Sequence, residues 1–370
     1  MVELIPKGDI QNWTSVTTSI NGMKLAACVI DGFIYTSTDC GETWIQRGEK
    51  GMWFKIVSSA NGNILAAITF YDDDNDSNNG YIYISIDSGE TWNQCVIQNE
   101  QSSKMWYNDI ALSADGSKLV ACVLNGFIYT SIDYGKIWNK RATKEDWVSV
   151  ASSADGNNLV ACTSSFKNGN IYISNNSGIS WNCTSAPPAN WNSVTSSADG
   201  KRLFACITIE ITKIPLNVDY DMYDPYDDRH MDRFSNRYDY KEEGGYIYLS
   251  EDSGMTWNRT RAPQGYWEDI KCSNDGRTLV ALDRIISLEE TLIHRIYISN
   301  NSGETWIQIN REPKTFRTIE LSKDGTRLIT CIKNEHIYII NLAYIFCGSL
   351  QDFKQKYLKY KQKYLNLKNF

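Results

Sequence analysis

One short motif occurs six times in this chain and constrains its fold more than any other feature. The motif reads Ser-x-Asp/Asn-x-Gly-x-Thr/Ser/Ile-Trp, and its Asp or Asn, Gly and Trp residues are Asp39, Gly41 and Trp44; Asp87, Gly89 and Trp92; Asp133, Gly135 and Trp138; Asn176, Gly178 and Trp181; Asp252, Gly254 and Trp257; and Asn301, Gly303 and Trp306. Most of the tryptophans are spaced 43 to 49 residues apart. That is the period of a four-stranded blade, so the sequence predicts a repeat protein of the β-propeller type.

The residue types of the motif are those that a tight turn requires. An Asp or Asn side chain can accept hydrogen bonds from nearby backbone N–H groups, and glycine adopts a positive φ angle at little cost. The tryptophan then begins the next strand with its ring in an apolar layer. We therefore interpret the motif as a device for folding the chain.

In these residues and their spacing the chain resembles the Asp-box (BNR) repeat proteins, which include sialidases, sortilin-type receptors, xyloglucanases and photosystem II assembly factors. The resemblance implies a β-propeller fold. It also implies that the boxes stabilise turns and take no part in catalysis.

A second pattern precedes each box and occurs seven times. It consists of an aromatic residue, a short alternating strand, a turn that often contains Asp-Gly, and an apolar strand, and it begins at Trp13, Trp53, Trp106, Trp147, Trp191, Trp267 and Phe316. We assign strands a and b to the two sides of this turn, strand c to the Ile-Tyr-x-Ser segment, and strand d to the segment that follows the box. The aromatic residues are predicted to pack between blades, or alternatively to surround the mouth of a channel.

The seventh unit lacks a box and a strand d. Leu4 lies nine residues before Trp13, as Trp44 lies nine residues before Trp53, so residues 4–8 align with residues 44–48. They should therefore supply the missing strand by pairing with residues 337–340. The predicted fold is an all-β, seven-bladed propeller of four-stranded antiparallel blades (residues 1–340), closed by the N-terminal strand and followed by a short C-terminal helix.

Composition narrows the cellular setting. The chain has 370 residues and a net charge of −7, and it has no apolar stretch of about 20 residues that could span a bilayer. Five cysteines occupy the same position in strand b of different units, too far apart to cross-link: Cys28, Cys122, Cys162, Cys206 and Cys331. We expect reduced thiols and a protein that is not secreted, and the negative charge disfavours nucleic-acid binding by the propeller.

The repeat is interrupted by insertions between strands b and c, which all lie on the face opposite the boxes. They comprise residues 71–79, 209–245 and 283–294. Tyrosines give contact area and acids select a basic partner, so we predict interaction loops at Tyr71, Asp72, Asp74, Asp76, Tyr220, Tyr223, Asp224, Tyr226, Asp227 and Asp228. The alternative is a solvated loop without a partner.

Metal and enzyme chemistry have little support in the sequence. Asp72, Asp74 and Asp76 alternate as in a calcium loop, but the glycine and glutamate that such a loop needs are absent, and no metal or cofactor is expected.

Sialidases carry an aromatic residue followed by Arg-Ile-Pro near the N-terminus and have six blades, whereas this chain has Glu3 in place of the arginine and seven units. A sialidase-like or other glycan-processing activity therefore remains the alternative to a scaffold without catalytic residues.

Residues 341–370 form a separate tail with six lysines and one aspartate, which leaves −12 on the propeller. Phe353, Tyr357, Tyr360, Tyr364 and Leu367 recur on one face of a predicted helix. Residues 357–368 resemble a C-terminal signature shared by proteins of mimivirus-type giant viruses. This resemblance implies a viral protein of the host cytoplasm or viral factory, or one carried in the virion, whereas the basic helix alone would suit an acidic surface.

These observations favour a protein-interaction scaffold that binds protein partners through the face with the insertions. The alternative is a carbohydrate-binding or glycan-hydrolysing propeller.

Overall fold

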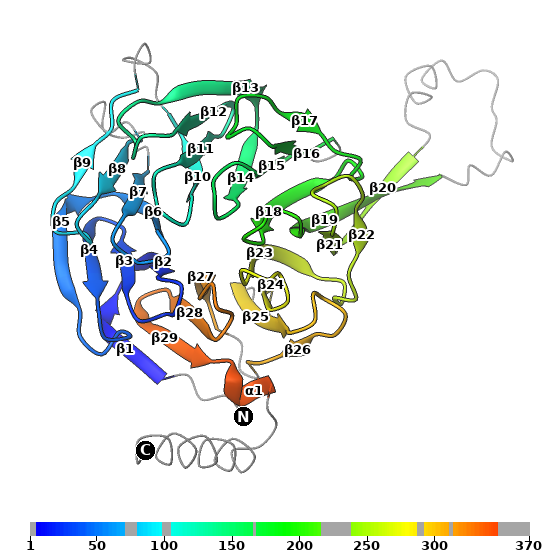
Figure 1. Cartoon of the computed structure of the whole chain (residues 1–370). Helices are drawn as coiled ribbons and strands as arrows, with labels where there is room; N and C mark the ends of the chain where they lie inside the picture. Colours follow the sequence, from blue (N-terminus) through cyan, green and yellow to red (C-terminus); the bar gives the residue numbers. More distant parts are fainter. Residues whose placement is uncertain are drawn as a thin grey trace, which may run out of the picture.

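The computed structural model describes residues 5–70, 80–97, 105–165, 168–215, 238–286, 292–310 and 314–346. Seven separate antiparallel sheets are arranged around a central axis, each with its strand a innermost (Figure 1). The predicted seven-bladed β-propeller is confirmed. No helix in the described ranges has the length and apolar character needed to cross a membrane.

The strands follow the predicted order in every blade. Strand a of blades one to seven is β2 (Trp13–Thr18), β6 (Trp53–Ser58), β10 (Tyr107–Leu112), β14 (Trp147–Ser152), β18 (Asn190–Ser196), β23 (Tyr266–Cys272) and β27 (Phe316–Leu321). Strand b is β3 (Leu25–Val29), β7 (Leu65–Thr69), β11 (Leu119–Val123), β15 (Leu159–Thr163), β19 (Leu203–Pro215), β24 (Leu279–Ile286) and β28 (Arg327–Ile332). Strand c is β4 (Gly32–Ser37), β8 (Ile82–Ser85), β12 (Gly126–Ser131), β16 (Ile171–Ser174), β21 (Ile247–Ser250), β25 (Leu292–Ser299) and β29 (Glu335–Asn341). Strand d is β5 (Ile45–Gly51), β9 (Asn93–Gln94), β13 (Asn139–Glu145), β17 (Asn182–Cys183), β22 (Asn258–Arg259), β26 (Ile307–Gln308) and, for blade seven, β1 (Ile5–Gln11).

The N-terminal strand closes the ring, as the sequence predicted. Strand β1 pairs antiparallel with β29, and Ile5, Pro6 and Lys7 lie opposite Ile339, Tyr338 and Ile337. The outermost strand of blade seven therefore comes from the opposite end of the described chain. Because every blade then has its strands a to d, with β20 as a fifth strand in blade five, none exposes strand c as an open edge.

The aromatic residues that begin strand a fill the space between neighbouring blades. Trp13, Trp147, Trp191 and Trp267 are at most 1% exposed. The ring of Trp147 meets Tyr172 of strand c in its own blade edge to face, with 5.0 Å between ring centroids. It also belongs to an apolar cluster with Val120, Cys122 and Ile128 of blade three. The prediction that these rings pack between blades is confirmed for the buried members of the series.

One member of the series was assigned one residue too early. In blade three Tyr107 pairs with Val123 in the way that Trp147 pairs with Thr163, so Tyr107 and not Trp106 occupies the packing position. Trp106 is 48% exposed. Two adjacent aromatic residues fit the pattern equally well, and only the pairing register separates them.

Each box forms a closed hydrogen-bonded turn. In blade two the Gly89 N–H donates to Ser85 Oγ at 2.8 Å, the Thr91 N–H donates to Asp87 Oδ1 at 2.9 Å, and the indole N–H of Trp92 donates to the Gly89 carbonyl at 3.1 Å. The glycines have positive φ angles as predicted, between 79° and 91°. The residue before each glycine also has a positive φ, which the sequence did not indicate; Ser88, at 62°, is an example.

The strand-b cysteines Cys28, Cys122, Cys162, Cys206 and Cys331 are buried and free. Burial raises the pKa of each of these thiols, to about 12 for Cys28, where hydrogen bonds from Thr14 and Ser15 act in the opposite direction. They therefore act as small apolar residues of the core.

Two of the predicted insertions begin and end as continuations of strands b and c, as far as the structure describes them. In blade five β19 continues beyond the sheet and pairs with β20 (Tyr238–Gly244) from Ile209 to Pro215. In blade six Asp283 pairs with Arg295, and the pairing continues to Ile286 opposite Leu292, so residues 283–286 and 292–294 belong to strands and not to the predicted loop; residues 287–291 lie outside the described ranges. Isoleucines at 285, 286 and 293 extend the β pattern and explain the difference.

The chain after β29 begins the predicted tail. Leu342 is fully buried, and α1 (Ala343–Phe346) places Ile345 and Phe346 against the apolar core of blades six and seven. The amphipathic positions Phe353 to Leu367 lie outside the described residues. The tail thus starts on the propeller itself.

Candidate functional site

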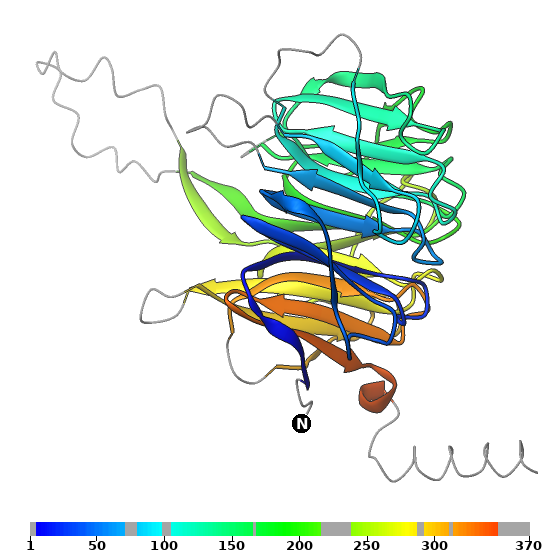
Figure 2. The same cartoon turned by 90° about the vertical axis from the view of Figure 1, so that its left-hand side faces the viewer.

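The ten residues predicted as interaction loops all lie outside the described ranges: Tyr71, Asp72, Asp74, Asp76, Tyr220, Tyr223, Asp224, Tyr226, Asp227 and Asp228. The structure does place the strand ends that carry them. Both segments connect strands b and c, and so leave the propeller on the face that also carries the connections between strands d and a (Figure 2). We call this the insertion face, and the opposite one the box face. The candidate site described below comprises the inner edge of the ring and the part of the insertion face around the central axis, which we call the insertion-face mouth.

Strand a carries a β-bulge at the same place in all seven blades. In blade four, for example, Trp147 pairs with Thr163 and Ser149 with the adjacent Cys162, so that Val148 is the extra residue. A bulge changes the direction of the side chains that follow it. Here the residue after the bulge reaches strand a of the next blade.

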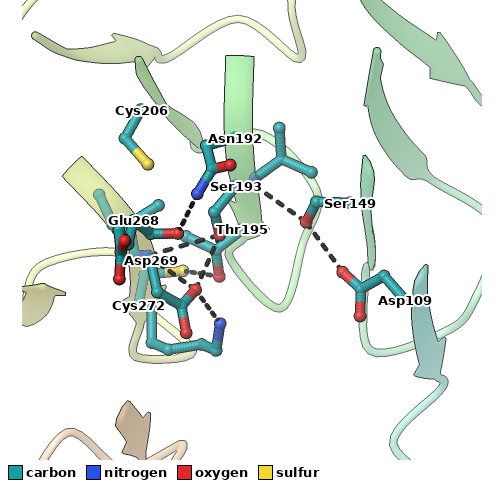
Figure 3. Close-up of polar contacts among 12 residues, drawn as sticks. Asp109, Ser149, Asn192, Ser193, Thr195, Cys206, Glu268, Asp269 and Cys272 are labelled. Carbon is teal, nitrogen blue, oxygen red and sulfur yellow. Dashed lines mark hydrogen bonds and ion pairs between the residues drawn. The ribbon is translucent and has the colours of Figure 1, made fainter. Parts of the chain in front are cut away.

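Figure 3 shows these contacts at the inner edge of blades three to six. Asp109 Oδ2 accepts a hydrogen bond from Ser149 Oγ at 2.8 Å, and Ser149 Oγ accepts one from the Val194 N–H at 3.2 Å. Ser193 Oγ donates to Asp269 Oδ1 at 2.8 Å. The inner strands are therefore held together by polar side chains as well as by the apolar core.

Lysines complete this network at two positions. Lys55 of blade two forms an ion pair with Asp109 of blade three, and Lys271 forms one with Asp269 within blade six. Burial acts to lower the pKa of Lys271, but the carboxylates of Asp269 and Glu320 outweigh it and the pKa is raised. Burial raises the pKa of Glu320, although nearby lysines oppose the shift.

At the box-face end of the inner edge, the seven blades are joined by a continuous ring of backbone hydrogen bonds. Each turn between strands a and b contributes one residue, and the first six of these residues donate their N–H to the carbonyl of the next one at 2.7–2.8 Å, in the order Ile20, Ala60, Ala114, Ala154, Ala198, Asn274 and, as the last acceptor, Lys323. The Asp324 N–H then donates to the Ile20 carbonyl at 3.0 Å and closes the circle. The inner edge of the propeller is therefore fixed at this end, and four of the seven residues are alanines.

The insertion-face mouth has an aromatic sector in blades two and three. Phe54, the bulged residue of blade two, contacts Phe70 with 4.3 Å between ring centroids. Phe70 is 39% exposed and Trp106 is 48% exposed. We call Phe54, Phe70 and Trp106 the aromatic sector.

The connections that carry Phe70 and Trp106 touch each other. A Cβ atom added to Gly80 would lie 2.2 Å from the Met105 carbonyl and 3.3 Å from the Thr69 carbonyl. The residue at position 80 must therefore lack a side chain for the two connections to approach. This contact brings Phe70, next to Thr69, and Trp106, next to Met105, to the same part of the mouth.

Blade six contributes a charged sector. The Glu268 carboxylate lies 3.4 Å from Arg284 Nη1 and 3.0 Å from Nε2 of the buried His294. The buried Asp283 accepts hydrogen bonds from Arg295 Nε and from the backbone N–H of Tyr266, each at 2.8 Å.

Burial raises the pKa of Asp283, although the guanidinium of Arg295 acts against the shift. Sequence reasoning missed this sector, because residues 283–294 were interpreted as a loop. The continued β pattern of Ile285 and Ile293 was the signal that could have revealed it.

The described part of the site has no metal-binding cluster, and its buried carboxylate Asp109 is occupied by hydrogen bonds within the protein. No group of three or more His, Cys, Asp or Glu side chains that could hold a metal ion occurs in the described part of the chain. The oxygens of Asp109 already accept hydrogen bonds from the N–H groups of Ile110 and Val150 and from Ser149 Oγ. An acid–base residue needs an oxygen that faces a substrate, and the hydrogen bonds of Asp109 face the protein.

Comparison with known proteins shows the fold. No protein-family model matches the chain, and no curated protein matches its sequence. The GH74 xyloglucanase from Xanthomonas campestris is similar in structure, with a TM-score of 0.66 and 12% identity, over 92% of this chain and 54% of that chain. This chain thus spans about half the length of the xyloglucanase.

Two other solved structures match over nearly their whole length. YCF48, solved bound to the D1 peptide, has a TM-score of 0.59 and 14% identity over 92% of this chain and 96% of that chain. Hydrazine synthase from Kuenenia stuttgartiensis has a TM-score of 0.61 and 13% identity over 90% of this chain and 97% of that chain. At these identities the similarity concerns the β-propeller fold alone.

Proposed function

We propose that this protein is a non-enzymatic interaction scaffold that holds a segment of a partner protein against the insertion-face mouth. The observation that carries the proposal is the aromatic sector, in which Phe70 and Trp106 are exposed on a rigid ring. Aromatic rings supply large contact areas at low entropic cost and dominate binding at protein interfaces. The structure of YCF48 with the D1 peptide supports a peptide segment as the class of ligand.

The charged sector adds a second kind of contact on blade six. Arg284 and Arg295 pair with Glu268 and Asp283, and a third of each arginine side chain is exposed. Paired guanidinium groups still have N–H groups that can donate to a ligand. A segment crossing the mouth would therefore meet aromatic rings in blades two and three, and fixed charges in blade six.

A carbohydrate ligand is the second candidate. Aromatic side chains such as Trp106 can stack on sugar rings as well as on peptide side chains, and one of the similar folds is a xyloglucanase. A glycan would need the same aromatic sector. The nature of the ligand must therefore be tested separately from its location.

Both questions can be addressed with purified full-length protein, a displayed peptide library and a glycan array. We expect the protein to select peptides, and we expect Phe70→Ala and Trp106→Ala to weaken their binding about tenfold or more, as for central interface residues. Ile307→Ala, an exposed position on the outer strand of blade six, is the matched control and should bind normally. Selection of glycans alone, or peptides that bind the two alanine variants as tightly as the parent, would contradict the proposal.

We further propose that the scaffold acts in a cell infected by a giant DNA virus, in the viral factory or the particle. The support is the resemblance of residues 357–368 to the tail of such proteins, together with the six lysines of the tail. The full chain and a chain ending at residue 348, each fused to a fluorescent protein, should then differ in location in infected cells. Identical diffuse distributions would argue against a role of the tail as an address.

A further inference from the structure

Blade three exposes an apolar surface on the box face. Ile132 is 64% exposed, Tyr134 42% and Ile137 58%, and all three lie in or beside one box turn. Isolated apolar residues are normal on protein surfaces, but three in one turn form a patch. We call these residues, with Lys136, Arg141 and Ile179, the blade-three patch.

Two of the exposed residues, Ile137 and Tyr134, make the turn of this box less favourable than the other turns. In blade two Thr91 Oγ1 donates to Asp87 Oδ2 at 2.6 Å, whereas Ile137 at the same position of blade three has no hydroxyl group. Tyr134 has a φ angle of 61°, at a position that is Ser or Cys in the other boxes. A bulky residue is unfavourable in this conformation. Departures of this kind from a local rule are typical of functional sites.

The patch is also basic, because the arginine of blade three lacks an ion pair that the corresponding arginine of blade one makes. In blade one Arg47 Nε donates to Thr36 Oγ1, and Arg47 Nη2 lies 4.0 Å from Glu90 in the box of blade two.

Arg141 makes the same bond to Thr130, but the residue that corresponds to Glu90 is Ile179, which is 65% exposed. No acid lies within ion-pair distance of Arg141 in the described ranges. Lys136 replaces the glutamate of blade three itself.

The chain contains a segment of complementary chemistry. Residues 219–228 hold five aspartates, three tyrosines and no lysine or arginine. Tyrosine rings suit an apolar patch, and aspartates suit exposed cations. The segment is inserted between β19 and β20, whose pairing runs outward from Ile209 opposite Gly244 to Pro215 opposite Tyr238.

The β19–β20 ribbon points away from its own blade-three patch. Figure 2 shows the ribbon leaving the ring on the insertion face, whereas the box turns lie on the opposite face. A ribbon with seven residue pairs extends about 20 Å. The patch on a second copy of the chain is therefore the more accessible target.

We propose that copies of this protein associate head to tail, with residues 219–228 of one copy bound to the blade-three patch of the next. The two surfaces differ, so the contact is heterologous and leaves one segment and one patch free at the ends of each assembly. The proposal does not depend on what the insertion-face mouth binds.

The test is sedimentation velocity of the full-length protein over a range of concentrations and at two salt concentrations. We expect the mean mass to rise with protein concentration and association to weaken at high salt, because surface charges are screened. A Lys136→Glu/Arg141→Glu variant and a Tyr220→Ser/Tyr223→Ser/Tyr226→Ser variant should each associate about tenfold or more weakly. Ile137→Thr, which restores the hydroxyl of the turn, should weaken association without lowering the melting temperature.

Lys50→Glu is the control, because Lys50 is an exposed cation on the outer strand of blade one; it should associate normally. Mixing the charge-reversed patch variant with the tyrosine variant distinguishes head-to-tail contact from symmetric contact. The charge-reversed variant keeps residues 219–228 intact, and the tyrosine variant keeps the blade-three patch intact. The mixture should therefore form a heterodimer, and no larger assembly, because the remaining two surfaces are both altered. A monomeric parent at all concentrations, association unchanged in both variants, or a mixture without heterodimers would overturn the proposal.

Discussion

At the scale of single residues, the turn aspartates show how local hydrogen bonds determine ionisation. Hydrogen bonds from Thr43 and Ser37 lower the pKa of Asp39 to about 2, and bonds from Thr256 and Ser250 do the same for Asp252. Asp252 is exposed and Asp39 is partly buried, and burial acts to raise the pKa of both carboxyl groups, so the lowered pKa comes from these donors. The sequence correctly predicted such acceptors, because Asp followed by Gly and Thr has the donors within reach.

These lowered pKa values predict how stability changes in acid. A carboxylate with a folded-state pKa of about 2 contributes stability that is fully present above the unfolded-state value of about 3.9, and the contribution is lost as the pH falls toward 2. An Asp39→Asn/Asp252→Asn variant should fold, because Asn176 Oδ1 accepts the Ser180 N–H at 2.9 Å in an equivalent turn. Between pH 5 and pH 2.5 its melting temperature should fall less than that of the parent. Parallel curves for the two proteins would show that these groups do not contribute.

At the scale of secondary-structure elements, three outer strands share an irregular residue. Strands β1, β5 and β13 each have seven residues and carry Gly8, Gly48 and Ala142 at the equivalent position, with φ angles of 68°, 63° and 58°. Alanine is unfavourable at a positive φ, whereas glycine is not. Blade three therefore accommodates backbone strain where the other two blades avoid it.

Ala142→Gly should stabilise the protein. Relief of the left-handed conformation is worth about 1–2 kcal/mol, and the greater flexibility of glycine in the unfolded chain offsets about 0.5–1 kcal/mol. We expect a net gain of about 0.5–1 kcal/mol in the free energy of unfolding, measured by chemical denaturation. The reciprocal Gly48→Ala should lose stability, because its Cβ would also lie 3.2 Å from Trp92. A loss with Ala142→Gly would contradict the strain argument.

The elements also show where sequence reasoning succeeds and where it fails. The pairing of residues 5–7 with β29 was predictable, because the segment keeps the spacing of other outer strands. The position of Tyr107 was not, since Trp106 beside it is an equally good aromatic candidate and the bulge that separates them has no side-chain signature. The pairing of Asp283 with Arg295 was missed, because charged residues in an extended hairpin look like loop residues.

At the scale of the whole molecule, the ring is closed at both its inner and its outer edge. The circle of turn hydrogen bonds joins all seven blades at the inner edge, and β1 completes blade seven at the outer edge. The circle could not be predicted, because backbone hydrogen bonds can form with almost any residue type. The alanine at four of the seven positions was the one regularity in the sequence. The combination of the aromatic and charged sectors also escaped prediction, since Trp106 and Glu268 come from different blades and lie on one face only once the ring has formed. The ten predicted interaction residues lie outside the described ranges and stay a prediction.

Closure by the N-terminal strand is the central structural claim, and a truncation tests it directly. We compare the melting temperature of the full chain with that of a chain lacking residues 2–8, in the presence and absence of a synthetic peptide of residues 2–12. Loss of β1 exposes the edge of β29 beside Ile337 and Ile339, so the truncated chain should melt about 5 °C or more below the parent and recover with the peptide. A truncated chain that melts at the temperature of the parent would contradict closure by this strand.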